Sequence, residues 1–163
     1  MITIDVVGAS SKSTKRLLEE AASFYFRKLL GRKSRPPVLL TIRLRKNLLQ
    51  KAGAKADCFL IQDEDELYEY EVRIDSGMNL GAILRCLAHE MIHVKQYLTG
   101  EMKDDQGAWL TTWKKKTVDT RKVDYYDLPW EIEAHGRELG LYETFVTHKR
   151  YQKKKWYRDM DFA

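Results

Sequence analysis

The sequence predicts an α+β fold, in which a small mixed or antiparallel sheet of three to four strands packs on two helices. Three observations lead to this fold class. The chain has 163 residues, of which 44% are hydrophobic, and this is enough for one domain with its own core. Short β-branched segments and long segments of helical periodicity follow each other in the order strand, helix, three strands, helix, hairpin, helix. No internal repeat or linker divides the chain.

The first half of the chain contains the segments expected to form the sheet. Residues 2–7 (ITIDVV) are rich in β-branched side chains and end at a glycine, which is typical of a short strand. A helix is expected over 14–30, where apolar residues recur at helical spacing after several serines that can cap it. Three more strands are expected, at 38–44, 58–61 and 68–74. Charged and apolar residues alternate in the last of these, so one of its faces should meet solvent.

The second half predicts two further helices with a hairpin between them. Asn79 can cap a long helix over 80–98, and a glycine two residues beyond that helix would close it. Two short β-like runs around a polar turn indicate a small hairpin within 109–119. Asp127 can cap a final helix that runs to about residue 148 and tolerates a proline in its first turn.

The basic charge of the chain is concentrated at its C-terminal end. The formal net charge is +5, and residues 149–163 hold six basic and two acidic residues. Residues 1–148 hold 23 basic and 22 acidic residues and are nearly neutral. We therefore expect one domain over 1–148, followed by a basic tail that could contact nucleic acid or another acidic partner.

Other bulk features bear on location. No run of about 18 apolar residues occurs, so we expect no contact with the membrane interior. The N-terminus shows no basic segment ahead of a long apolar stretch, so no secretory signal is expected. Cys58 and Cys86 are too few for a disulfide framework and lie in apolar segments. We expect two small buried thiols in a monomeric protein of the reducing cytoplasm.

The most informative segment is the HExxH motif at 89–93, which lies within the helix expected over 80–98. Residues four apart lie on the same face of a helix, so His89 and His93 can reach one metal ion. Glu90 then lies beside the open coordination position of that metal, where a general base is needed. The rest of the helix is largely apolar, and burying these three side chains without a partner would be costly. The motif therefore predicts one catalytic zinc ion.

A catalytic zinc site needs a third ligand from the protein. The downstream candidates are Glu131, Glu133, Glu138, His135, His148 and several aspartates. The segment 126–135 (YDLPWEIEAH) places Glu131 and Glu133 at the start of the last helix, and the small Ala134 would let that helix approach another closely. The residues alone leave Glu131 and Glu133 as alternatives.

The HExxH motif followed by Glu-x-x-Ala on a second helix resembles the gluzincin metallopeptidases. The chain looks most like the minigluzincins and other small stand-alone peptidase domains, including ones encoded by phages. The resemblance covers 87–98 and 126–138, and it implies that Glu131 is the third zinc ligand. His135 stands where that family usually has an acidic or amide residue.

The resemblance also implies an activity, which is zinc-dependent hydrolysis of a peptide or protein substrate. Glu90 would take a proton from a water activated by the metal and pass it to the leaving amine. The family adds a Tyr or His donor that stabilises the oxyanion, for which Tyr125, Tyr126 and His135 are candidates. It also pairs an extended substrate with an edge strand, for which the strand at 68–74 is a candidate.

Two other interpretations stay open. The phrase LAHEMIHVKQY at 87–97 also looks like the SprT-like proteases, in which a histidine supplies the third ligand, and His135 and His148 are candidates for it. The chain would then be a non-catalytic or nucleic-acid-associated metal-binding accessory protein. A zinc amidase that acts on cell-wall peptides would use similar chemistry.

Overall fold

The computed structural model describes residues 2–31, 37–64, 67–104, 109–158 and 160–162 of the chain. The β-strands are β1 (Ile2–Val7), β2 (Val38–Arg45), β3 (Ala56–Glu64), β4 (Leu67–Asp75), β5 (Met102–Asp104), β6 (Leu110–Trp113) and β7 (Lys116–Asp119). The α-helices are α1 (Lys12–Leu30), α2 (Leu48–Ala52), α3 (Leu80–Leu98), α4 (Pro129–Val146), α5 (Lys149–Gln152) and α6 (Lys155–Arg158). Two 3-10 turns, η1 (Thr120–Lys122) and η2 (Tyr125–Asp127), precede α4.

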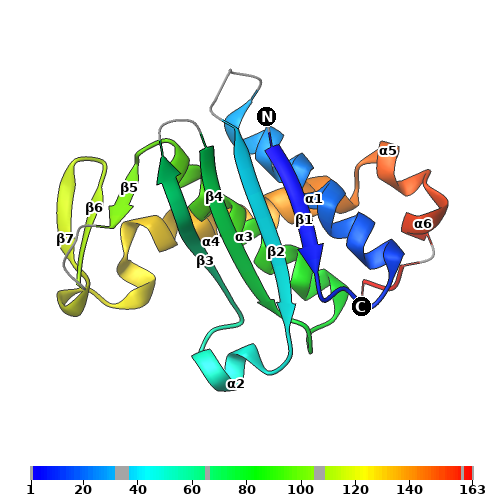
Figure 1. Cartoon of the computed structure of the whole chain (residues 1–163), viewed down its shortest axis with the longest axis horizontal. Helices are drawn as coiled ribbons and strands as arrows, with labels where there is room; N and C mark the ends of the chain where they lie inside the picture. Colours follow the sequence, from blue (N-terminus) through cyan, green and yellow to red (C-terminus); the bar gives the residue numbers. More distant parts are fainter. Residues whose placement is uncertain (1, 32–36, 65–66, 105–108, 159, 163) are drawn as a thin grey trace.

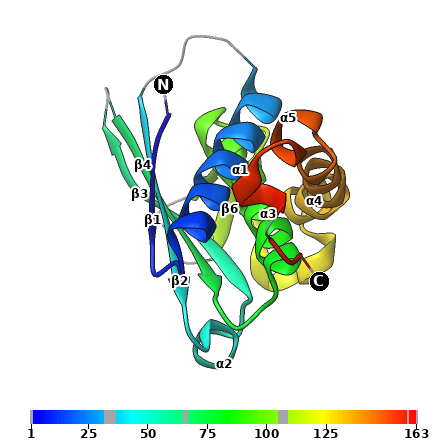
Figure 2. The same cartoon turned by 90° about the vertical axis from the view of Figure 1, so that its right-hand side faces the viewer.

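Four strands form the main sheet, in the order β1-β2-β4-β3 (Figure 1). The pairs β1–β2 and β2–β4 are parallel, whereas β3 runs antiparallel to β4. Figure 2 shows the sheet edge-on, with α1, α3 and α4 all on one side of it. The strands also carry cross-strand ion pairs, Arg43 with Glu71 and Arg73 with Asp57, on side chains that remain partly exposed. The α+β class and the small mixed sheet are thus confirmed.

Helix α3 is the centre of the molecule. Every residue of the segment 87–96 is buried, because the sheet and α1 cover one side of the helix and α4 covers the other. The helix begins where the sequence predicts, since the Asn79 side chain accepts a hydrogen bond from the Ala82 N–H at 2.8 Å. None of the helices in the described ranges is long and apolar enough to cross a membrane.

Helix α4 lies behind α3, and Ala134, which is fully buried, permits their close contact as predicted. The predicted cap of α4 is wrong, because Asp127 belongs to the turn η2 and the helix begins at Pro129. Proline at the first helical position needs no N–H partner and has a suitable φ, so it sets the start without a side-chain cap.

A second, smaller sheet of β5, β6 and β7 confirms the predicted hairpin and extends it by one strand. The hairpin turn consists of Lys114 and Lys115, which both have positive φ values, +46° and +73°. Figure 1 places this sheet at one end of the molecule, beside the edge strand β3, with α5 and α6 at the opposite end.

The C-terminal segment is part of the domain, which corrects the predicted boundary at residue 148. Tyr151 and Tyr157 are 2% and 7% exposed and belong to the main core, and the Tyr157 hydroxyl donates to the Val146 carbonyl at 2.7 Å. The Phe162 carbonyl lies so close to Gly81, at the start of α3, that a Cβ there would approach it to 2.5 Å. The basic side chains of 149–158 are exposed, but the backbone that carries them packs against α1 and α4.

Candidate metal centre

Helix α3 carries three polar side chains in its buried middle. His89, Glu90 and His93 are only 8%, 5% and 8% exposed. The two histidines lie one helical turn apart, and their Nε2 atoms are 3.1 Å from each other. Polar groups with this burial are costly unless they have partners, so their partners indicate what the group can do.

Helix α4 supplies the carboxylate of Glu131 to this pair. One of its oxygens is 3.2 Å from His89 Nε2 and the other is 3.4 Å from His93 Nε2. The structure therefore brings together the set predicted from the sequence. Burial alone would raise the pKa of Glu131, but the hydrogen bonds with His89 and His93 outweigh burial and lower it. Glu131 is therefore charged.

The other nitrogen of each ring is already occupied. His89 Nδ1 lies 2.7 Å from an oxygen of Glu138, and His93 Nδ1 lies 2.8 Å from Oε1 of Gln96. Each Nδ1 therefore already has its own acceptor, and Nε2 is the nitrogen that meets Glu131. Nε2 donates to that carboxylate when it carries a proton, and loss of this proton would leave a lone pair for a metal ion. Outer partners of this kind are typical of metal-ligating histidines, because they fix the tautomer and the ring orientation.

Glu133, the alternative third ligand, points elsewhere. Its carboxylate accepts hydrogen bonds from Lys95 at 3.0 Å and from Gln96 at 3.1 Å, and it pairs with Arg137. These contacts tie α4 to α3 beside the histidine pair. Glu138, which was also a predicted candidate ligand, contacts Nδ1 of His89, on the side of the ring away from Glu131, and forms an ion pair with Arg85. Of the three glutamates, only Glu131 faces both Nε2 atoms.

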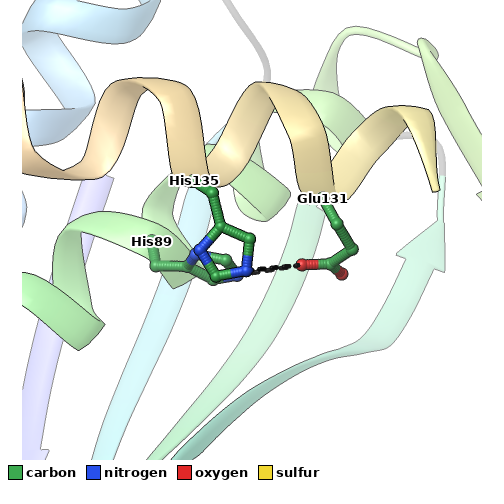
Figure 3. Close-up of side chains that lie close together, drawn as sticks. All are labelled: His89, Glu131 and His135. Atoms are coloured by element: carbon green, nitrogen blue, oxygen red, sulfur yellow. Dashed lines mark ion pairs between the residues drawn. The ribbon is translucent and has the colours of Figure 1, made fainter. Parts of the chain in front are cut away.

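His135 lies next to the same group (Figure 3). Figure 3 shows His89 from α3 and both Glu131 and His135 from α4 directed toward one region, so these three could also hold a metal ion. His135 Nε2 is 4.0 Å from Glu131, whereas His93 Nε2 is 3.4 Å away. The His135 side chain is 39% exposed, and its ring lies against the His89 ring at a tilt of 56° with centroids 4.6 Å apart. His93 is therefore the closer and more deeply buried partner of Glu131.

An open cleft of about 280 Å³ adjoins the group. Glu90 lines this cleft, and within the described parts of the chain no residue hydrogen-bonds to its carboxylate. Burial raises the pKa of Glu90 to about 8. Cys58 also lines the cleft, and both it and Cys86 are free thiols that are half-buried, whereas buried thiols were expected.

The remaining predicted residues divide into those at the cleft and those away from it. The Tyr125 hydroxyl donates to Glu131 at 2.7 Å and lies at the centre, whereas Tyr126 is 73% exposed and contacts the ring of His135. His148 caps α5 and packs on Phe24 far from the cleft, which removes it as a candidate ligand.

The edge strand at the cleft is β3, and not the predicted strand at 68–74. That strand forms β4, which pairs with β2 on one side and β3 on the other and so has no free edge. Ala56, Asp57 and Cys58 of β3 line the cleft, and among the described strands β3 pairs with β4 alone. An extended segment bound in the cleft would therefore meet β3.

Together these residues form a buried group of two histidines and one carboxylate, which could hold a metal ion beside an open cleft.

Comparisons with protein-family models, with curated proteins and with solved structures found no match for this chain. The function must therefore be argued from these side chains themselves.

The sequence interpretation missed Gln96. It lies three residues after His93, and residues three apart adjoin on one helix face, so this spacing could have identified it. The contact between Glu138 and His89 joins two helices, and no local pattern in the sequence indicates it.

Proposed function

We propose that the chain is a zinc-dependent peptidase, in which His89, His93 and Glu131 hold one ion and Glu90 is the general base. The observation that carries this proposal is the position of Glu90. Glu90 lines the same open cleft as His89, His93 and Glu131, whose ligand atoms converge. Two imidazoles and a carboxylate with a free fourth position are the donor set of a catalytic zinc site, whereas structural sites are closed by four protein ligands.

The residues around the site supply the other roles. A bound zinc ion would lower the pKa of a water and polarise the carbonyl to be cleaved. Glu90 would take a proton from that water and pass it to the leaving amine. Burial raises the pKa of Glu90, and the positive charge of a bound ion would favour the carboxylate form that this step needs. Burial, together with the hydrogen bond to Glu131, raises the pKa of Tyr125, so its hydroxyl stays protonated and can donate to the developing oxyanion. The backbone of β3 can pair with an extended substrate.

Substitution of the base tests the proposal. Glu90→Gln should keep its zinc and lose about 10²- to 10⁴-fold in cleavage rate, because the amide cannot accept the proton. Zinc content and chelator-sensitive cleavage of an unbiased peptide panel are the two measurements. Glu143→Gln, an exposed change of the same kind on α4, should leave both unchanged. A zinc-loaded Glu90→Gln protein with near-full activity would refute the assignment.

A second candidate is a metal-binding accessory protein that associates with nucleic acid. One observation favours it, namely the six exposed basic side chains of α5, α6 and their connection.

Inclusion of cell-wall peptides in the panel of substrates separates a zinc amidase from a general peptidase.

A further inference from the structure

The cleft beside the candidate centre has an unbalanced acidic lining. Among the described residues that line it, four carry carboxylates and none is a lysine or an arginine. Asp57 is neutralised by Arg73, whose Nε lies 2.7 Å away. Glu90 and Glu131 belong to the proposed catalytic group. Asp104 is the lining carboxylate that has neither a counter-ion among the described residues nor a role in that group.

The Asp104 carboxylate is nevertheless held in a defined place. The Tyr97 hydroxyl donates to its Oδ2 at 2.7 Å, and the Thr111 hydroxyl donates a longer bond of 3.4 Å to its Oδ1. The backbone of Asp104 is fixed as well, because it pairs with Thr111 in the small sheet. Both side-chain partners are neutral, so they set the position of the carboxylate and leave its charge uncompensated.

This position lies within reach of a substrate. Tyr97 follows His93 by four residues on α3, a rise of about 6 Å, and its hydroxyl holds Asp104, which lines the same cleft as His89 and His93. Side chains on one face of an extended peptide are about 6.6 Å apart. A peptide paired with β3 would therefore place a side chain near Asp104 from a residue close to the bond that is cut.

We propose that Asp104 selects peptides that carry lysine or arginine next to the cleaved bond, an inference that rests on the proposed peptidase function. A neutral side chain would displace water from this carboxylate and leave its charge unpaired, which is unfavourable. A cationic side chain replaces the lost water with a charge-assisted hydrogen bond. Tyr97 and Met102, which also line the cleft, offer apolar surface for the methylene groups of such a side chain.

The experiment uses two peptides that are identical except for arginine or citrulline beside the bond that the zinc-loaded protein cuts. These side chains have nearly the same shape and differ in charge. Asp104 is exposed, and exposed ion pairs are weak, so we expect a preference of about two- to fivefold in kcat/KM for the arginine peptide. Asp104→Asn keeps an acceptor for Tyr97 and should bring the ratio close to one. Glu143→Gln makes the same change of charge outside the cleft and should keep the wild-type ratio.

A binding measurement separates this inference from the proposed function. The affinities of the uncleaving Glu90→Gln protein for the two peptides, measured by fluorescence anisotropy, should show the same preference and the same loss of it with Asp104→Asn. Absence of cleavage of every peptide would refute the proposed function, and the binding arm would still decide the role of Asp104. Equal use and equal binding of the two peptides, or an unchanged preference in a folded, zinc-loaded Asp104→Asn protein, would overturn the inference.

Discussion

At the scale of single residues, the outer hydrogen bonds of the two imidazoles prepare the centre for a metal. Glu138 is 6% exposed and lies 2.7 Å from His89 Nδ1. Glu138→Gln should weaken zinc binding by about 10- to 100-fold, because the negative charge that orients the ring and increases its basicity is lost. Competition with a chromophoric chelator measures the affinity. Glu143→Gln is the matched control on the exposed face of α4, and an unchanged affinity of the Glu138→Gln protein would show that His89 needs no such support.

The choice of the third ligand is also a question about single residues. Glu131→Ala should lose the metal, because it removes the carboxylate that faces both Nε2 atoms. Glu133→Ala should keep the metal and lower the melting temperature, since the buried Lys95 loses one of its two carboxylate partners. His135→Ala should also keep the metal. The measurements are the zinc content of each variant after dialysis and its melting curve. If Glu131→Ala kept its zinc and Glu133→Ala or His135→Ala lost it, the residue changed in the zinc-free variant would be the third ligand instead.

Much of this centre could be predicted from the sequence because its main motif is local. The spacing of His89 and His93 encodes their shared face, and the identity of Glu90 follows from its place in the motif. The sequence pattern could not decide which of Glu131 and Glu133 is the ligand. The two residues are two positions apart on α4 and differ mainly in the direction that each side chain faces. That direction depends on how α4 packs against α3, which no short segment specifies. The role of Asp104 likewise depends on a strand, β5, that the sequence did not predict.

At the scale of elements, the β6–β7 hairpin contains backbone strain that can be relieved. Lys115 has φ +73°, a conformation that costs a side-chain-bearing residue about 1 kcal/mol or more and costs glycine little. Lys115→Gly should therefore raise the free energy of unfolding by about 1 kcal/mol. Lys116→Gly, one residue later in β7, should instead lower it by about 0.5–1 kcal/mol. Urea denaturation distinguishes the two, and a destabilised Lys115→Gly protein would contradict the expected relief.

Element order was harder to predict than element type. The sequence predicted the four main strands, one from β-branched content and one from alternation, but the position of each strand in the sheet is set by long-range pairing. The segment 68–74 alternates like an edge strand with one wet face, yet it lies between β2 and β3. Its partly exposed charges, such as Arg73 and Glu71, are compensated by neighbours on adjacent strands. Alternation therefore indicates an exposed sheet face, which is not the same as an exposed edge.

At the scale of the whole molecule, the C-terminal segment closes the core. Its composition, with six basic residues within 149–158, indicated a solvated tail. The segment is instead packed on the core, because Tyr151 and Tyr157, which lie among those charges, contact Phe145 at ring-centroid distances of 4.8 and 6.4 Å. Short charged helices can thus cover a core when a few large apolar side chains are interleaved with the charges.

Removal of the residues after Arg150 should consequently unfold or strongly destabilise the chain. Loss of a large buried aromatic side chain typically costs about 3–5 kcal/mol, and the total stability of a domain is only about 5–15 kcal/mol. The truncated chain would lose two such side chains, Tyr151 and Tyr157. Thermal unfolding followed by circular dichroism measures the effect, and a truncated chain with an unchanged melting temperature would show that the segment is dispensable.

The nucleic-acid alternative therefore needs substitutions that spare this packing. Lys153, Lys154 and Lys155 are exposed, so changing all three to glutamine should leave the melting temperature within a few degrees of the wild type. If the basic end of the molecule binds nucleic acid, the wild-type protein should bind a DNA duplex with an affinity that falls steeply with salt. The triple variant should then lose about three units of that log–log slope, one for each phosphate contact removed. Equal slopes for the two proteins, or no salt-dependent binding by the wild type, would show that the basic surface is only a solvated face of the molecule and would leave the proposed peptidase function without a nucleic-acid role.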